Sequence, residues 1–84
     1  MNEFYCVNIE FYDNREVKAC LTHRQARKKP RNQYKVIPGI QAFKIWMTSE
    51  TTASNFVASV LIGEIYIDDV LMYFDQAAEW EKAA

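Results

Sequence analysis

The chain has 84 residues, of which half are apolar and 14% are aromatic, and its formal net charge is −1. This length allows one domain with a single modest core, residues 1–84, and the apolar content excludes an intrinsically disordered chain. No apolar run approaches the roughly 18 residues of a membrane helix, and the N-terminus lacks the basic start of a signal peptide, so we expect a soluble cytoplasmic protein with no membrane partner.

The first two predicted elements form a β-hairpin. Residues 3–12 alternate between apolar and polar side chains, and residues 16–22 repeat this alternation less strongly. A two-residue loop would set the apolar face of one strand beside the polar face of the other. A loop of three residues, 13–15, with Asn14 in the left-handed conformation, instead places the apolar side chains of both strands on one face.

The register of this hairpin also decides the state of the two cysteines. With Phe11 opposite Val17, Cys6 and Cys20 share a face of the sheet but are only diagonal neighbours. Diagonal Cα separations of roughly 7 Å or more exceed the reach of a normal disulfide. We therefore expect two reduced thiols.

Residues 22–35 are predicted to form an exposed basic segment. The chain has no acid between Val17 and Ser49, whereas its end from Glu50 onward is acidic. Ala26 is the only apolar side chain between Thr22 and Gln33, so the segment has no side chains that would anchor it to a core. We expect it to protrude, either extended or as one or two helical turns that end before Pro30.

Two further strands and a helix are predicted next. Residues 34–37 read as a short strand before the Pro38-Gly39 turn, and a longer strand follows in which Phe43, Ile45 and Met47 alternate with Ala42, Lys44 and Trp46. Ser49 or Thr51 then caps a helix that ends at Gly63. The apolar stripe of this helix consists of Ala53, Phe56, Val57, Val60 and Leu61.

The last elements are predicted as a strand over residues 64–67 and a helix from Asp68, its N-cap, through Lys82. Its inward side chains are expected to be Val70, Leu71, Phe74 and Ala78. The fold class is therefore α+β: a small, mainly antiparallel sheet, made of the N-terminal hairpin and one or two further strands, with two C-terminal helices packed on one face.

The last predicted helix carries more apolar surface than one stripe. A second face either packs inside the domain or contacts a partner, which is a second copy of the chain or a target protein. The candidate partner interface consists of Tyr73, Asp75, Ala77, Glu79 and Trp80.

Catalytic and metal-binding motifs are scarce. Two glycines exclude a phosphate-binding loop, and one histidine excludes most zinc sites and paired-histidine catalysis. The Cys20-x-x-His23 spacing offers at most three soft ligands with Cys6, and the acids at positions 64, 68 and 69 fit the first turn of a helix better than a magnesium site. We expect no enzyme activity, no cofactor and no metal.

The basic segment indicates a small, non-catalytic binding protein with a regulatory role. Its positive side chains are suited to phosphates, and nearby aromatic rings are suited to base stacking, so the preferred partner is nucleic acid, RNA rather than DNA. The candidate nucleic-acid-binding residues are Arg24, Arg27, Lys28, Lys29, Arg31, Tyr34, Lys35, Lys44 and Trp46.

The alternative is a small inhibitor or regulator of another protein, of the accessory type found in phages and mobile elements. It would bind an acidic or nucleic-acid-binding protein through the basic segment or through the acidic last helix.

Overall fold

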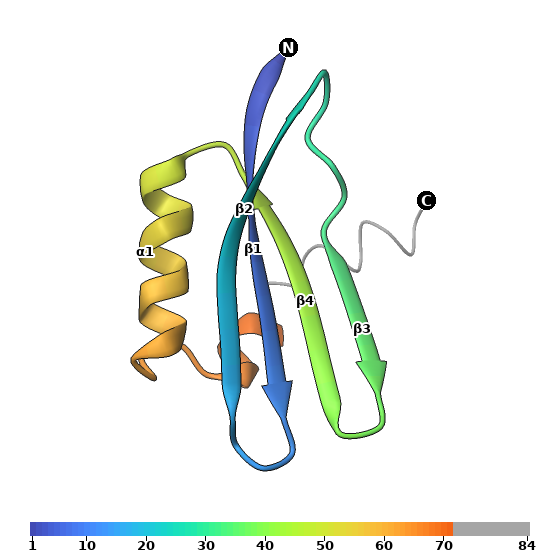
Figure 1. The fold of residues 1–84 in the computed structure, drawn as a ribbon, viewed down its shortest axis with the longest axis vertical. Coiled ribbons are helices and arrows are strands. Elements are labelled where there is room, and N and C mark those ends of the chain that lie inside the picture. The colour runs from blue at the N-terminus through green and yellow to red at the C-terminus, as the bar shows by residue number, and fades with distance from the viewer. Residues whose placement is uncertain (72–84) are drawn as a thin grey trace.

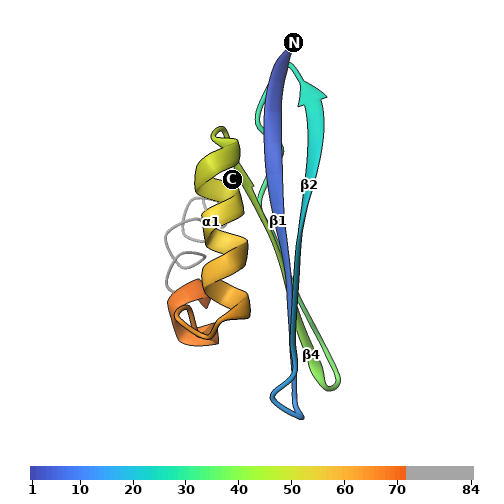
Figure 2. The same cartoon turned by 60° about the vertical axis from the view of Figure 1, so that its left-hand side comes forward.

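A computed structural model of the protein describes residues 1–71, which form a four-stranded sheet with helices on one face (Figures 1 and 2). The elements are β1 (Asn2–Tyr12), β2 (Val17–Ala26), β3 (Gln33–Ile37), β4 (Ile40–Met47) and α1 (Glu50–Leu61). A second helix begins at residue 67 and is described through residue 71. The predicted α+β class is confirmed.

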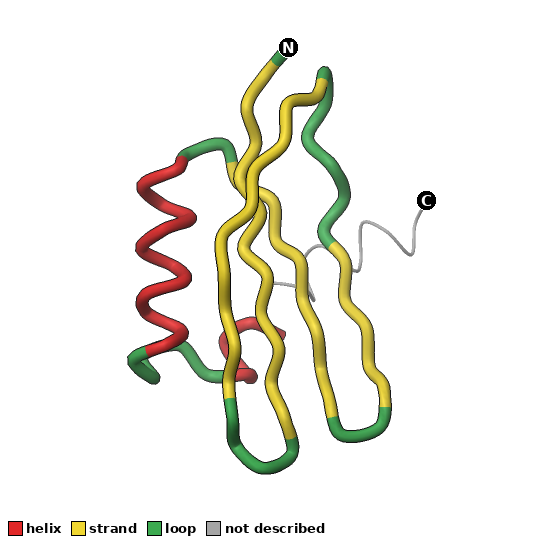
Figure 3. The backbone as a smooth tube through the Cα atoms, in the orientation of Figure 1, coloured by secondary structure: helices red, strands yellow, loops and turns green. Residues whose placement is uncertain are grey.

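All four strands pair antiparallel, in the order β2-β1-β4-β3. The chain thus makes two hairpins, β1–β2 and β3–β4, which join where β1 pairs with β4. The turns of both hairpins lie at the same end of the sheet (Figure 3). There the backbone N–H of Asp13 donates to the carbonyl of Gly39 over 3.0 Å, which ties the two turns together.

The main core lies between the sheet and the helices. Apolar side chains at alternate positions of β1 and β4 point to this side, as the alternation predicts. Its buried members are Val7, Ile9, Phe43, Ile45, Ala53, Val60 and Val70. The positions of Val70 and of the partly buried Leu71 confirm that the start of the last helix packs inward.

The hairpin register is confirmed, because Phe11 pairs with Val17, Cys6 with Thr22 and Cys20 with Asn8, and both cysteines are free thiols. The left-handed residue is Arg15, with φ of 69°, and not Asn14 as predicted. In a three-residue loop the first two residues form a type I turn and the third takes the left-handed conformation. The side chain of Asn14 instead accepts a hydrogen bond of 2.9 Å from the backbone N–H of Glu16.

β2 is longer than predicted and includes the first part of the basic segment. Its pairing with β1 continues to Ala26, which lies opposite Asn2, so no helical turn forms here. The strand is anchored by its backbone ladder and by polar side chains, since Gln25 donates to the carboxylate of Glu3 over 2.6 Å and His23 contacts the same carboxylate. Anchoring therefore does not require the apolar side chains that this segment lacks.

Helix α1 begins and ends where the sequence predicts. The hydroxyl of Ser49 caps it by accepting from the N–H of Thr52. At the other end Gly63, with φ of 84°, allows the N–H of Glu64 to donate to the carbonyl of Ser59 over 2.9 Å, a Schellman motif. Leu61 is expected in the apolar stripe, but it is 55% exposed.

The predicted strand over residues 64–67 is wrong. Residues 64 and 65 form a bend, and the second helix starts at residue 67, with Tyr66 and not Asp68 at its N-cap position, two residues earlier than predicted. The carboxylate of Asp69 accepts from the N–H of Tyr66 over 2.9 Å, a reciprocal cap that fixes this start. The predicted extension of the helix to Lys82, with Phe74 and Ala78 inward, lies outside the described residues.

Candidate nucleic-acid interface

Basic side chains gather on the face of the sheet that faces away from α1 and the second helix. The register sets this arrangement: Lys35 pairs with Ala42, which pairs with Glu10, which pairs with Lys18, so all four lie in one row across the sheet. Because side chains alternate along each strand, Arg24 on β2 and Lys44 on β4 lie on the same open face. The structure thus brings together Arg24, Lys35 and Lys44, which the sequence predicted, and adds Lys18.

The loop between β2 and β3, residues 27–32, continues this basic surface beyond the sheet. The side chains of Arg27, Lys28, Lys29 and Arg31 are all exposed. The loop lies at the end of the sheet opposite the hairpin turns (Figure 1).

One polar contact anchors this loop to β4. The side-chain oxygen of Asn32 accepts a hydrogen bond of 2.8 Å from the backbone N–H of Trp46. β3 begins only at Gln33, opposite Lys44, so this amide lies beyond the β3–β4 ladder. Asn32 was not a predicted site residue, and an isolated asparagine in a polar segment gives no sequence signal for this role.

Trp46 lies on the open face but is only 8% exposed. It forms a second apolar cluster with Phe4 and Cys6, and the guanidinium carbon of Arg24 lies 5.2 Å from the centre of its ring. This geometry is a cation–π contact, which holds Arg24 over the ring. We predicted an open stacking platform at Trp46, but the structure gives this side chain a packing role.

Tyr34 lies on the opposite face from Lys35 and Lys44, because it pairs with Phe43. Its ring stacks on Phe43 with 4.7 Å between ring centres and 8° between planes, and its hydroxyl donates to the side chain of Gln41 over 3.0 Å. The structure therefore does not bring Tyr34 together with the basic residues of the open face. Alternation of side chains along a strand indicates this separation from sequence alone, because Tyr34 and Lys35 are adjacent and therefore point to opposite faces.

The charges of the open face are not neutralised within the described residues. The one salt bridge in residues 1–71 joins His23 to Glu3, on the face that packs against the helices. Hydrogen bonds from Gln25 and His23 lower the pKa of Glu3 below its ordinary value. The basic side chains of β2, β3, β4 and the 27–32 loop thus remain available for an anionic ligand.

A depression of about 380 Å³ lies on the open face, toward the hairpin turns, where β2, β1 and β4 run side by side. Asn8 and Glu10 on β1 lie in its middle, between β2 on one side and β4 on the other. The side chains that line it from the open face are Asn8, Glu10, Lys18, Cys20, Ala42 and Lys44. No group of three or more histidine, cysteine, aspartate or glutamate side chains suited to a metal ion occurs within residues 1–71.

Glu10 is held in place beside this depression. The hydroxyl of Tyr12 donates to Oε1 of Glu10 over 3.0 Å, and this bond raises the pKa of Tyr12. Lys18 lies directly opposite Glu10 on β2, yet its ammonium lies over the ring of Tyr12, 5.3 Å from the centre. No ion pair between Lys18 and Glu10 forms among residues 1–71.

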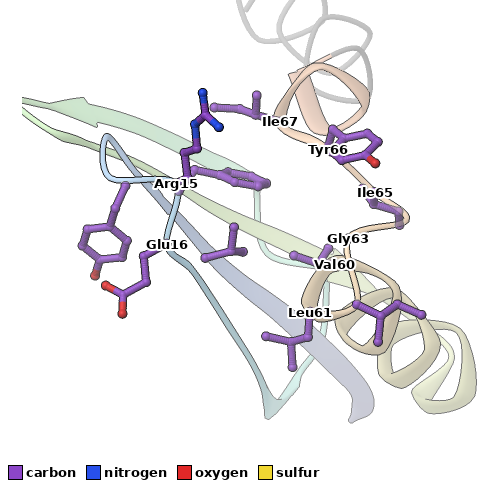
Figure 4. A pocket seen from close by; sticks show the side chains of 12 residues that line it. Arg15, Glu16, Val60, Leu61, Gly63, Ile65, Tyr66 and Ile67 are labelled. Atoms are coloured by element: carbon purple, nitrogen blue, oxygen red, sulfur yellow. The ribbon is translucent and has the colours of Figure 1, made fainter.

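A larger cavity of about 650 Å³ lies on the other side of the molecule, between the turn of the β1–β2 hairpin and the end of α1. Figure 4 shows Arg15 and Glu16 on one side of it and Leu61, Ile65 and Tyr66 on the other. Its lining is largely apolar, so it does not extend the basic surface.

The candidate partner interface, Tyr73, Asp75, Ala77, Glu79 and Trp80, lies outside the described residues. Within residues 1–71 no helix has the length and apolar character needed to span a membrane. Comparisons of the chain with protein-family models, with curated proteins and with solved structures give no match. Function is therefore inferred from the residues themselves.

Proposed function

We propose that this protein is a non-catalytic binding protein whose ligand is single-stranded nucleic acid, with RNA preferred over DNA. The observation that supports the proposal is the gathering of basic side chains on the open face and on the 27–32 loop, with no acid paired to them within residues 1–71. Such a surface neutralises backbone phosphates, and its arginines can grip them with two parallel hydrogen bonds.

The shape of this surface favours a single strand over a duplex. An open sheet face lets a flexible strand lie across it with its bases turned toward the protein, as in common RNA-binding sheets. The preference for RNA rests on exposed polar side chains beside the lysines. Gln33, for example, pairs with Lys44 on the open face, where its amide can bond a ribose 2′-hydroxyl.

Salt dependence of binding tests the proposal. If about four phosphates are contacted, the logarithm of the association constant for oligouridine should fall with the logarithm of salt concentration with a slope near ~3. Fluorescence anisotropy of a labelled oligonucleotide measures this slope. The steepness of this slope should decrease by about 2 when Lys28, Lys29 and Arg31 are replaced together by alanine.

A matched control separates local contact from net charge. Ser54, Asn55 and Ala58 are exposed on α1, and replacing all three by glutamate changes the net charge as much as the loop variant does. This helix variant should keep the wild-type slope, apart from a small uniform loss of affinity. Binding that ignores salt, or that weakens equally in both variants, would contradict the proposal.

An inhibitor or regulator of another protein is the second candidate, because the same exposed loop can meet an acidic protein surface. Nuclease treatment distinguishes the two. Material that co-purifies at low salt and disappears after nuclease supports nucleic-acid binding, whereas a protein that co-purifies after nuclease and is lost in the loop variant supports the second candidate.

A further inference from the structure

Phosphate binding does not explain why a carboxylate, that of Glu10, lies among the basic side chains of the open face. It lies on the open face near the hairpin turns, between Lys18 on β2 and Ala42 on β4. A negative charge here repels phosphates and weakens the very interaction that the surrounding lysines provide. Its position at the depression therefore calls for a ligand group that donates hydrogen bonds.

The structure keeps this carboxylate available for such a group. Lys18, the cationic side chain directly across from it, lies over Tyr12 and forms no ion pair with it in the described chain. Tyr12 occupies one lone pair of Oε1 and fixes the orientation of the carboxylate. The remaining lone pairs of both oxygens can still accept hydrogen bonds.

The depression beside Glu10 has room for a planar base. Ala42 and Cys20 present small side chains on the two strands that flank Glu10 and Asn8, and Lys18 and Lys44 lie on the same two strands, around a volume of about 380 Å³. A carboxylate beside two ammonium groups thus lines a space large enough for a nucleobase.

We infer that this depression binds guanine, with Glu10 as the group that selects it. The inference rests on the proposed function, since it assigns a base to a strand held by the basic surface. Guanine is the base whose Watson–Crick edge carries two adjacent donors, N1–H and N2–H, which match the two oxygens of a carboxylate. Its neighbouring O6 is an acceptor for an ammonium group from Lys18 or Lys44.

The other bases fit this set of groups less well. Adenine and cytosine each present a ring-nitrogen acceptor beside their amino group, which a carboxylate repels, and uracil has a single donor between two acceptors. A good bidentate contact to a base commonly contributes about tenfold or more in discrimination. Alternating guanosine–uridine RNA should therefore bind about tenfold more tightly than oligouridine of equal length.

Three single substitutions separate base selection from phosphate binding. Glu10→Gln removes a negative charge and one acceptor, so it should raise affinity for oligouridine while lowering affinity for the guanosine-containing strand. Glu16→Gln removes an acid beside the β1–β2 turn that does not line the depression, so it should raise both affinities alike. Ala42→Ile fills the depression without changing charge, so it should abolish the preference and leave the salt slope unchanged.

The experiment measures the affinities of the full chain and these variants for labelled oligouridine, oligoadenosine and alternating guanosine–uridine RNA, with circular dichroism as a check of folding. Replacing guanosine by inosine, which lacks the 2-amino group, should weaken binding to the wild type. Equal wild-type affinities for all strands, or an unchanged preference in Glu10→Gln, would overturn the guanine inference alone. Loss of salt-dependent binding to every strand would instead overturn the proposed function.

Discussion

Asn32 is predicted to fix the position of the basic loop, and its replacement tests this directly. Asn32→Ala removes the acceptor of a part-buried bond of 2.8 Å to the backbone N–H of Trp46. A typical hydrogen bond contributes a net ~1 kcal/mol to the free energy of unfolding, and an amide left buried without an acceptor costs ~1–3 kcal/mol. Because this amide lies past the end of the β3–β4 ladder and its bond is only partly buried, we expect the lower figure, about 1 kcal/mol.

Urea denaturation followed by circular dichroism measures this loss. For a chain of this size a slope of about 1 kcal/mol per molar urea converts the loss into a midpoint lower by about 1 M. Hydrogen exchange gives a second readout, because the Trp46 amide should lose protection while amides of β1 keep theirs.

Asn32→Asp is the matched control, since it keeps an oxygen acceptor of the same size at the same place. Its midpoint should stay well above that of the alanine variant. A midpoint for Asn32→Ala within about 0.2 M of the wild type, or an equal fall for both variants, would refute the anchoring role.

Two further predictions concern titratable groups. Burial raises the pKa of the Cys6 thiol, whereas Cys20 is exposed, so iodoacetamide should alkylate Cys20 at least about tenfold faster than Cys6. Mass spectrometry after brief labelling measures the two alkylation rates. Equal rates would be inconsistent with a buried Cys6. The folded-state pKa of Glu3 is lowered by hydrogen bonds from Gln25 and His23, so its contribution to stability is present above its unfolded pKa and is lost as pH falls through its folded pKa. Glu3→Gln should therefore lower the unfolding midpoint at neutral pH, and a difference from wild type that persists in acid would contradict this.

Alternation along the strands predicted much of the fold. The side-chain period of two is strict, so requiring one apolar face was enough to choose the three-residue loop and the pairing of Phe11 with Val17. The same rule placed the main core on one face of the sheet. It also places Tyr34 and Lys35 on opposite faces of the sheet, although the two residues are adjacent in sequence.

Two of the differences between sequence and structure share a cause, which is that a segment can be anchored without apolar side chains. The end of β2 is anchored through its backbone and through Glu3, and the loop through Asn32, although neither segment is apolar. The burial of Trp46 had a sequence signal, because Phe4 and Cys6 alternate onto the same face and supply apolar neighbours. The depression beside Glu10 had no sequence signal, because its lining depends on the register between β1 and β4.

The junction of the two hairpins has a consequence for folding. Each hairpin closes locally, over short turns, whereas the pairing of β1 with β4 joins segments far apart in the chain and is costly to form. The depression lies across this junction, with Lys18 and Glu10 from one hairpin and Ala42 and Lys44 from the other. A ligand seated there holds both hairpins at once, so it would act as a clamp that slows their separation and stabilises the protein as a whole.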